Sequence, residues 1–195
     1  MTTFKQNVLR FLYPLVRKAA KGGTYGMIAT NDNRTEPIIP FHEQKATLNN
    51  GRQIDFSTYA GKKVLIVNTA SNCGYTGQYA ELQKLHERFS DKLFIIAFPA
   101  NDFREQEESN DDEIAKFCQV NYGVTFPIAK KGVVIKCEEQ LPIYKWLTNS
   151  EANGWNDHQP DWNFGKYLID EKGILTKYFG PSISPLDNEF VTSVE

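Results

Sequence analysis

Two short runs of apolar, β-prone residues, joined by an amphipathic helix pattern, constrain the fold of this chain most. The runs span residues 64–67 and 93–98, and they have the character of strands that are covered on both faces. Between them, apolar residues recur every three or four positions over residues 79–89. This order predicts a strand–helix–strand unit with parallel strands, whose active groups usually lie at the carboxyl ends of the strands. Cys73 follows the first strand.

Further elements are expected downstream of this unit. A helix is predicted from Ser109, its N-cap, to a stop at Gly123. Residues 166–170 and 174–179 flank a glycine-containing turn and are expected to pair as strands. The sequence therefore predicts one α/β domain over residues 40–195.

The first 39 residues are expected to form a basic extension and a linker outside this domain. Residues 1–22 contain five Lys or Arg and no Asp or Glu, and their apolar residues have helical spacing that Pro14 would interrupt. Three interpretations stay open: a helix packed on the domain, an acid-poor transit segment, and a membrane-surface anchor. Residues 22–40 show no sustained period and are interpreted as linker.

The composition excludes several classes of protein. The 22 Lys and Arg and 24 Asp and Glu leave a net charge of −2, so the chain lacks the basic footprint of a nucleic-acid-binding protein. No apolar stretch approaches the roughly 20 residues that cross a bilayer.

Three cysteines cannot form a closed disulfide framework, and they favour a reducing compartment, here expected to be the cytoplasm. The cysteines and histidines lack metal-ligand spacing, so neither a metal nor another cofactor is expected.

Cys73 and Cys118 differ in the electrostatic setting that the sequence predicts. Cys73 precedes a helix start, where backbone N–H groups and the helix dipole lower a thiol pKa. Cys118 lies near a helix C-terminus, so it is expected to be partly buried and less acidic. Cys73 is thus suited to act as the attacking thiol, and Cys118 is suited to resolve the oxidised Cys73 by thiol–disulfide chemistry. For each of them the alternative is an inert cysteine in the core. Cys137, between two charged residues, is expected to be structural.

Three ordered motifs resemble the glutathione peroxidase family. They are residues 68–76 (NTASNCGYT), residues 98–103 (FPANDF) with Gln106 and Glu107, and residues 161–164 (DWNF) with Lys166 and residues 168–170. The resemblance covers about residues 40–190. It implies a thioredoxin-like fold, in which helices flank a central mixed β-sheet.

Carried over position by position, the resemblance implies a catalytic tetrad of Cys73, Gln106, Trp162 and Asn163. Two amides and an indole N–H can stabilise a negatively charged sulfur and the charge on a departing oxygen. Cys118 stands where the thioredoxin-dependent branch of the family carries its resolving cysteine.

The sequence also departs from the family pattern near the site. Gly77 stands where proline is usual, and Arg104 stands where glycine is usual. Neither change removes a tetrad residue. Arg104 is expected to alter access to the site.

The resemblance implies a thiol peroxidase that reduces hydrogen peroxide and organic hydroperoxides. Cys73 would become a sulfenic acid, Cys118 would condense with it, and thioredoxin or glutathione would reduce the disulfide. The short stretch between Trp146 and Trp162 lacks the insertion of tetrameric members, so a monomer is expected. Two alternatives stay open: a peroxide sensor that relays a disulfide to a partner, and a thioredoxin-like interaction module with inert cysteines.

Overall fold

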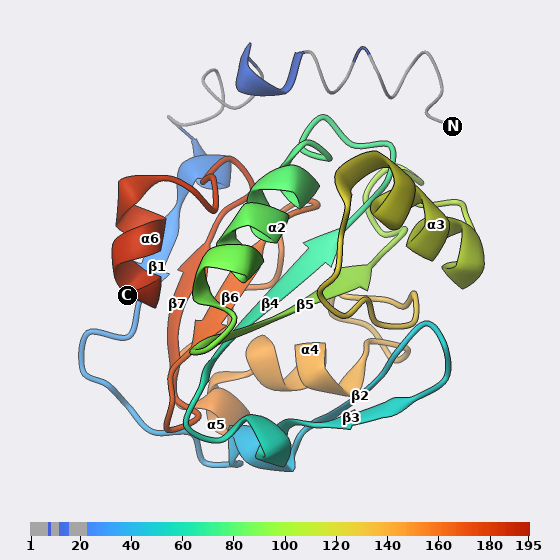
Figure 1. Cartoon of the computed structure of the whole chain (residues 1–195). Helices are drawn as coiled ribbons and strands as arrows, with labels where there is room; N and C mark the ends of the chain where they lie inside the picture. The colour runs from blue at the N-terminus through green and yellow to red at the C-terminus, as the bar shows by residue number, and fades with distance from the viewer. Residues whose placement is uncertain (1–7, 9–11, 16–22) are drawn as a thin grey trace.

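A five-stranded mixed sheet with the strand order β1-β7-β6-β4-β5 lies at the centre of the computed structural model (Figure 1). The two apolar runs of the sequence form β4 (Lys63–Thr69) and β5 (Leu93–Pro99), which pair in parallel as expected. The predicted late strand pair is β6 (Lys166–Ile169) and β7 (Leu175–Phe179), joined antiparallel. β6 also pairs antiparallel with β4, so the sheet is mixed.

Helices cover both faces of this sheet. One face carries α2 (Gln78–Phe89), α3 (Asp111–Tyr122) and α6 (Asn188–Val194), and the other carries α4 (Pro142–Leu147), α5 (Ser150–Asn153) and the hairpin of β2 (Lys45–Thr47) and β3 (Gln53–Asp55) (Figure 1). Short 3-10 helices are η1 (Thr24–Gly26), η2 (Phe41–Glu43) and η3 (Phe56–Tyr59). Leu65 and Val67 of β4 pack into the first layer, and Ile66 packs into the second. Burial on both faces therefore explains why residues 64–67 of this strand are all apolar.

The segment interpreted as linker contributes the edge strand of the sheet. β1 (Ile28–Thr30) pairs antiparallel with β7, with Ile28 opposite Phe179. This pairing satisfies backbone groups of β7 that an open edge would leave unpaired. The linker interpretation is wrong for these residues, because a three-residue strand is too short to show an alternating pattern.

The start of α3 differs by one residue from the expectation. Asn110, and not Ser109, is the N-cap: its side chain accepts a hydrogen bond from the Glu113 N–H at 3.0 Å, and the Glu113 carboxylate accepts one from the Asn110 N–H at 3.3 Å. Both residues are of cap-forming types, so only the geometry distinguishes them. Gly123 ends the helix with a φ of 64°, as expected from a left-handed cap.

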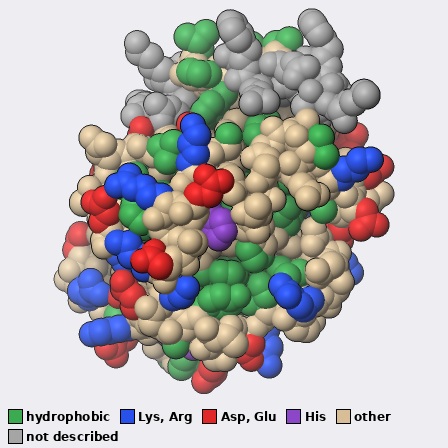
Figure 2. All heavy atoms as spheres, viewed as in Figure 1, with side chains coloured by type: hydrophobic (Ala, Val, Ile, Leu, Met, Phe, Trp, Pro, Cys, Tyr) green, Lys and Arg blue, Asp and Glu red, His purple; other side chains and the backbone are tan. Residues whose placement is uncertain are grey.

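The structure describes residues 8, 12–15 and 23–195, and the remainder of the expected N-terminal helix lies outside these residues. Val8 and residues 12–15 are helical. Within the described ranges, no helix has the length and apolarity that a membrane crossing requires. Acidic and basic side chains are interspersed over the face shown in Figure 2, in keeping with the small net charge.

Candidate active site

Cys73 lies in the turn between β4 and α2, at the carboxyl end of a central strand. The Thr76 hydroxyl accepts a hydrogen bond from the Cys73 N–H at 3.0 Å, and it lies 2.9 Å from the Ala70 carbonyl, to which it donates. These bonds fix the turn in a shape that buries the Cys73 side chain completely.

The Tyr75 N–H donates a hydrogen bond to the Cys73 sulfur at 3.4 Å, and three further donors, the Trp162 and Asn163 side chains and the Gly74 N–H, lie close enough to lower its pKa. Burial nevertheless has the largest effect, and it raises the pKa of the Cys73 thiol above its ordinary value while the four donors lower it. The expectation of a lowered pKa is therefore wrong for this closed site. Position before a helix does not reveal how completely the rest of the chain buries the sulfur.

The structure brings the four residues of the expected tetrad together from three separate segments. Asn163 Nδ2 donates a hydrogen bond to Gln106 Oε1 at 3.0 Å, and the Gln106 carbonyl accepts one from the Asn72 N–H at 3.0 Å. Gln106 therefore connects the loop of Asn163 to the loop of Cys73. Trp162 and Asn163 both lie beside the sulfur of Cys73.

Asn68 is a positioning residue that the sequence analysis did not single out. Its Nδ2 donates to the Trp162 carbonyl at 3.0 Å, and its own carbonyl accepts from the Phe164 N–H at 2.6 Å. These two bonds hold the loop that presents Trp162 and Asn163 against β4. The amide residue that directly follows the apolar run of residues 64–67 was the sequence signal that could have identified Asn68.

The exposed side of Trp162 is surrounded by a small aromatic and basic rim. Ring centroids of Phe103 and Tyr25 lie 5.6 and 6.1 Å from that of Trp162, and the Arg104 guanidinium carbon lies 5.4 Å from it. Arg104 adopts a φ of 53°, in the left-handed region that favours glycine. Arg104 therefore lies over the indole, and its effect on access to the site stays a prediction.

Cys118 is buried in α3 against Tyr79 of α2. Burial raises the pKa of the Cys118 thiol to about 12, although the neighbouring Tyr79 side chain lowers it. The expected weak acidity of this thiol is confirmed. Cys73 and Cys118 are both buried free thiols with different neighbours, so a disulfide between them stays a prediction. Cys137 is exposed, so it has no place in the core.

Glu107 is a fully buried carboxyl group beside the site, which the sequence analysis used only as part of a motif. Its Oε2 accepts a hydrogen bond from Ser71 Oγ at 2.8 Å, and its N–H donates to Asn101 Oδ1 at 2.8 Å. Burial raises its pKa to about 7, against the Ser71 hydrogen bonds and the charge of Lys131, which lower it.

The wild-type protein is expected to become less stable as the pH rises from 5 to 8. Replacing Glu107 with Gln is expected to remove much of this pH dependence. The folded protein holds a proton on Glu107 up to a pKa of about 7, whereas the unfolded chain releases it near 4.5. The free energy of unfolding should therefore fall by up to about 3 kcal/mol as the pH rises through this range. Denaturant unfolding of both proteins at the two pH values measures the difference. The exposed Glu108→Gln is the control, and an unaltered pH dependence in Glu107→Gln would contradict the assignment.

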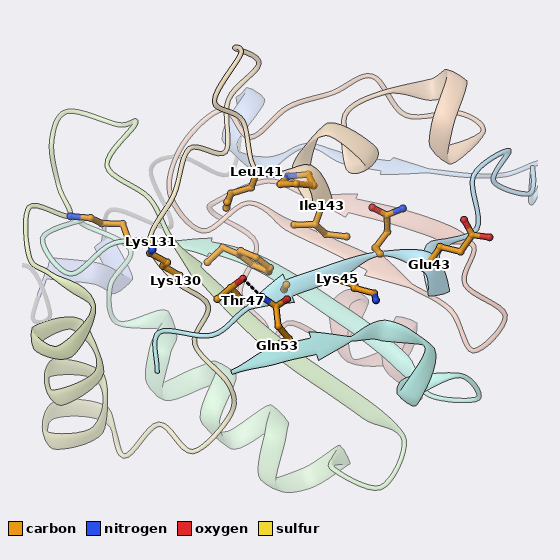
Figure 3. Close-up of a pocket in the computed structure, with 12 residues that line it drawn as sticks. Glu43, Lys45, Thr47, Gln53, Lys130, Lys131, Leu141 and Ile143 are labelled. Atoms are coloured by element: carbon orange, nitrogen blue, oxygen red, sulfur yellow. Dashed lines mark hydrogen bonds between the residues drawn. The ribbon is translucent and has the colours of Figure 1, made fainter. Parts of the chain in front are cut away.

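A hollow of about 440 Å³ lies on the opposite layer, between β2, β5 and α4 (Figure 3). Phe98 and Ile143 contribute apolar surface, and Lys45, Lys130 and Lys131 are among the residues around it. None of the expected site residues lines this hollow. The expected site residues therefore lie away from the hollow, with Cys73 at the carboxyl end of β4.

Known proteins resemble this chain in both sequence and structure. The family model described as glutathione peroxidase matches residues 41–148. A protein of Halalkalibacterium halodurans named glutathione peroxidase homolog BsaA is 45% identical over 149 residues, which are 76% of this chain and 94% of that protein. The glutathione peroxidase-like peroxiredoxin HYR1 of Saccharomyces cerevisiae is 44% identical over 136 residues, which are 69% of this chain and 83% of that protein.

A solved structure extends the comparison to the fold. The thiol:disulfide interchange protein of Chlorobium tepidum TLS, a thioredoxin family protein, matches with a TM-score of 0.59 at 14% identity. The match covers 84% of this chain and 98% of that protein. At this identity the likeness shows the fold alone, and it confirms the expected thioredoxin-like architecture.

Proposed function

The chain belongs to the glutathione peroxidase family, and we propose that its reaction takes place at Cys73, with Gln106, Trp162 and Asn163 completing the site. Membership makes the protein a peroxidase, which reduces a hydroperoxide at the expense of a thiol reductant. The observation that carries the site assignment is the convergence of four hydrogen-bond donors around the Cys73 sulfur.

In the proposed reaction the Cys73 thiol gives up its proton and its sulfur attacks one peroxide oxygen. A sulfur–oxygen bond forms, the oxygen–oxygen bond breaks, and the departing oxygen takes up the proton that the thiol has lost, to leave as water or an alcohol. The sulfur is oxidised by two electrons to a sulfenic acid. The Trp162 and Asn163 side chains are donors that favour the thiolate, and Gln106 holds the Asn163 amide in place.

The resolving step is assigned to Cys118. Its sulfur attacks the sulfenic acid, a disulfide forms, and the oxygen leaves as water. A dithiol of the thioredoxin type, or two molecules of glutathione, then reduces the disulfide. The presence of Cys118 in α3, one element beyond the loop of Gln106, supports the thioredoxin-dependent route. We also propose that the protein acts as a monomer, because the stretch between Trp146 and Trp162 lacks the insertion of tetrameric family members, and that it acts in the cytoplasm, because three cysteines cannot form a closed disulfide framework.

The intact mass of the reduced protein after one equivalent of hydrogen peroxide tests this assignment. We expect the wild type and the exposed-cysteine control Cys137→Ser to lose about two mass units, and Cys118→Ser to gain about sixteen from one retained oxygen. A wild-type mass that does not change would contradict the proposal and favour an interaction module with inert cysteines. Catalytic turnover with thioredoxin and its reductase, compared with glutathione and its reductase, identifies the reductant. A single oxidation without turnover in either system would favour the peroxide sensor.

A further inference from the structure

Lys166 is a fully buried lysine at the first position of β6, three residues beyond Asn163. Its ammonium group lies among main-chain carbonyl oxygens. Lys166 Nζ donates to the carbonyls of Phe164 at 2.8 Å and Ile183 at 2.7 Å, and it makes two longer bonds of 3.4 Å to the carbonyls of residues 180 and 181. A buried charge costs free energy unless polar groups surround it, and these four carbonyls do so. The bonds tie the segment after Asn163 to the loop that follows β7.

Phe164, the residue directly after Asn163, has a left-handed backbone with a φ of 70°. This conformation is strained for a bulky residue, and it persists only where surrounding contacts fix it. The Phe164 N–H donates to the Asn68 carbonyl at 2.6 Å, and the Phe164 ring meets that of Tyr79 edge-on, with 5.4 Å between centroids. Lys166 holds the other side of the residue, because its Nζ binds the Phe164 carbonyl.

The left-handed backbone at Phe164 decides where the side chain of Asn163 points. In an extended chain, the side chains of neighbouring residues point to opposite sides. Here Phe164 packs in the same layer as Cys73, and Asn163 lies beside the Cys73 sulfur while it donates to Gln106 Oε1 at 3.0 Å. Two consecutive side chains therefore enter one layer, and the turn at Phe164 allows this.

We propose that Lys166 is a positioning residue for the peroxidase reaction, and that its buried ammonium group fixes the turn at Phe164 that aims Asn163 at Cys73. The inference rests on the proposed roles of Cys73 and Asn163. Without the ammonium group the Phe164 carbonyl loses its donor, and the strained turn can relax to an ordinary backbone conformation. The Asn163 amide then leaves its place beside the sulfur.

The pH dependence of Cys73 alkylation by iodoacetamide, together with kcat/KM for hydrogen peroxide, tests this role. Lys166→Met keeps an apolar stem and removes the ammonium group. We expect the alkylation profile of this variant to shift to higher pH, because a misplaced Asn163 no longer favours the thiolate. We expect kcat/KM to fall by about a hundredfold, the effect of a small displacement of a catalytic group.

Lys63→Met is the matched control. Lys63 Nζ also donates to a main-chain carbonyl, that of Val194 at 2.9 Å, and its side chain is only 16% exposed. Lys63 begins β4, whereas Cys73 follows the other end of this strand. Loss of the Lys63 ammonium group should therefore leave the alkylation profile and kcat/KM at their wild-type values.

The double variant Lys166→Met/Asn163→Ala separates positioning from a direct effect of charge. If Lys166 acts through Asn163, its replacement should shift the profile little once the Asn163 amide is absent. An undiminished shift in the Asn163→Ala background would mean that the ammonium charge acts on the sulfur directly, and it would overturn the positioning role.

Lys166→Gln provides a second, milder change, since it keeps a neutral donor that is one bond shorter. We expect a smaller shift in the same direction, and no shift in either Lys166 variant that folds would overturn the proposal. Failure of the proposed site has a different signature, because Asn163→Ala alone would then keep the wild-type alkylation profile.

Discussion

Replacing Cys73 with serine is expected to lower the second-order rate constant for peroxide reduction by at least about a thousandfold. The serine oxygen cannot be oxidised to a counterpart of the sulfenic acid, so the two electrons that the peroxide accepts have no source. The smaller side chain fits the fully buried position, and the fold should be retained.

Peroxide consumption by the prereduced proteins measures this effect, with circular dichroism to verify the fold. Cys118→Ser is the informative comparison, because it retains Cys73 and should consume one equivalent of peroxide at the wild-type rate. A Cys73→Ser protein that keeps a rapid first turnover would move the attacking role to another cysteine.

Replacing Asn163 with alanine is expected to lower the same rate constant by about a hundredfold to a thousandfold, the usual effect of removing one preorganised donor. The change removes a donor to the Cys73 sulfur and the partner of Gln106 Oε1 at once. Because that donor lowers the pKa of the Cys73 thiol, its loss should raise the pKa further.

The pH dependence of Cys73 alkylation by iodoacetamide separates this role from a merely structural one. We expect the alkylation profile of Asn163→Ala to shift to higher pH. Gln106→Ala should give a smaller shift, because Gln106 acts on the sulfur through Asn163. Asn163→Asp keeps the size of the side chain but places a carboxylate near the sulfur, and its rate should be lower still. A wild-type alkylation profile in Asn163→Ala would remove Asn163 from the site.

The local elements of the fold were predictable from the sequence for a physical reason. A strand buried on both faces is mostly apolar, and an amphipathic helix repeats its apolar residues every three or four positions. Both patterns can be recognised from consecutive residues, as in β4 and α2. The three-residue β1 is too short to carry such a pattern, and its pairing with β7, about 150 residues further along the chain, is what makes it a strand.

The sequence by itself determined the strand–helix–strand unit, the place of Cys73 between β4 and α2, and the family to which the motifs belong. The tertiary structure decided the pKa of Cys73, because burial depends on residues from the whole chain and outweighs the donors that the local sequence supplies. It also decided which groups meet, as in the hydrogen bond of Gln106 with Asn163 and the bonds of Lys166 to carbonyl groups of two loops. Periodicity is a property of neighbours in sequence, whereas desolvation and contact are properties of neighbours in space.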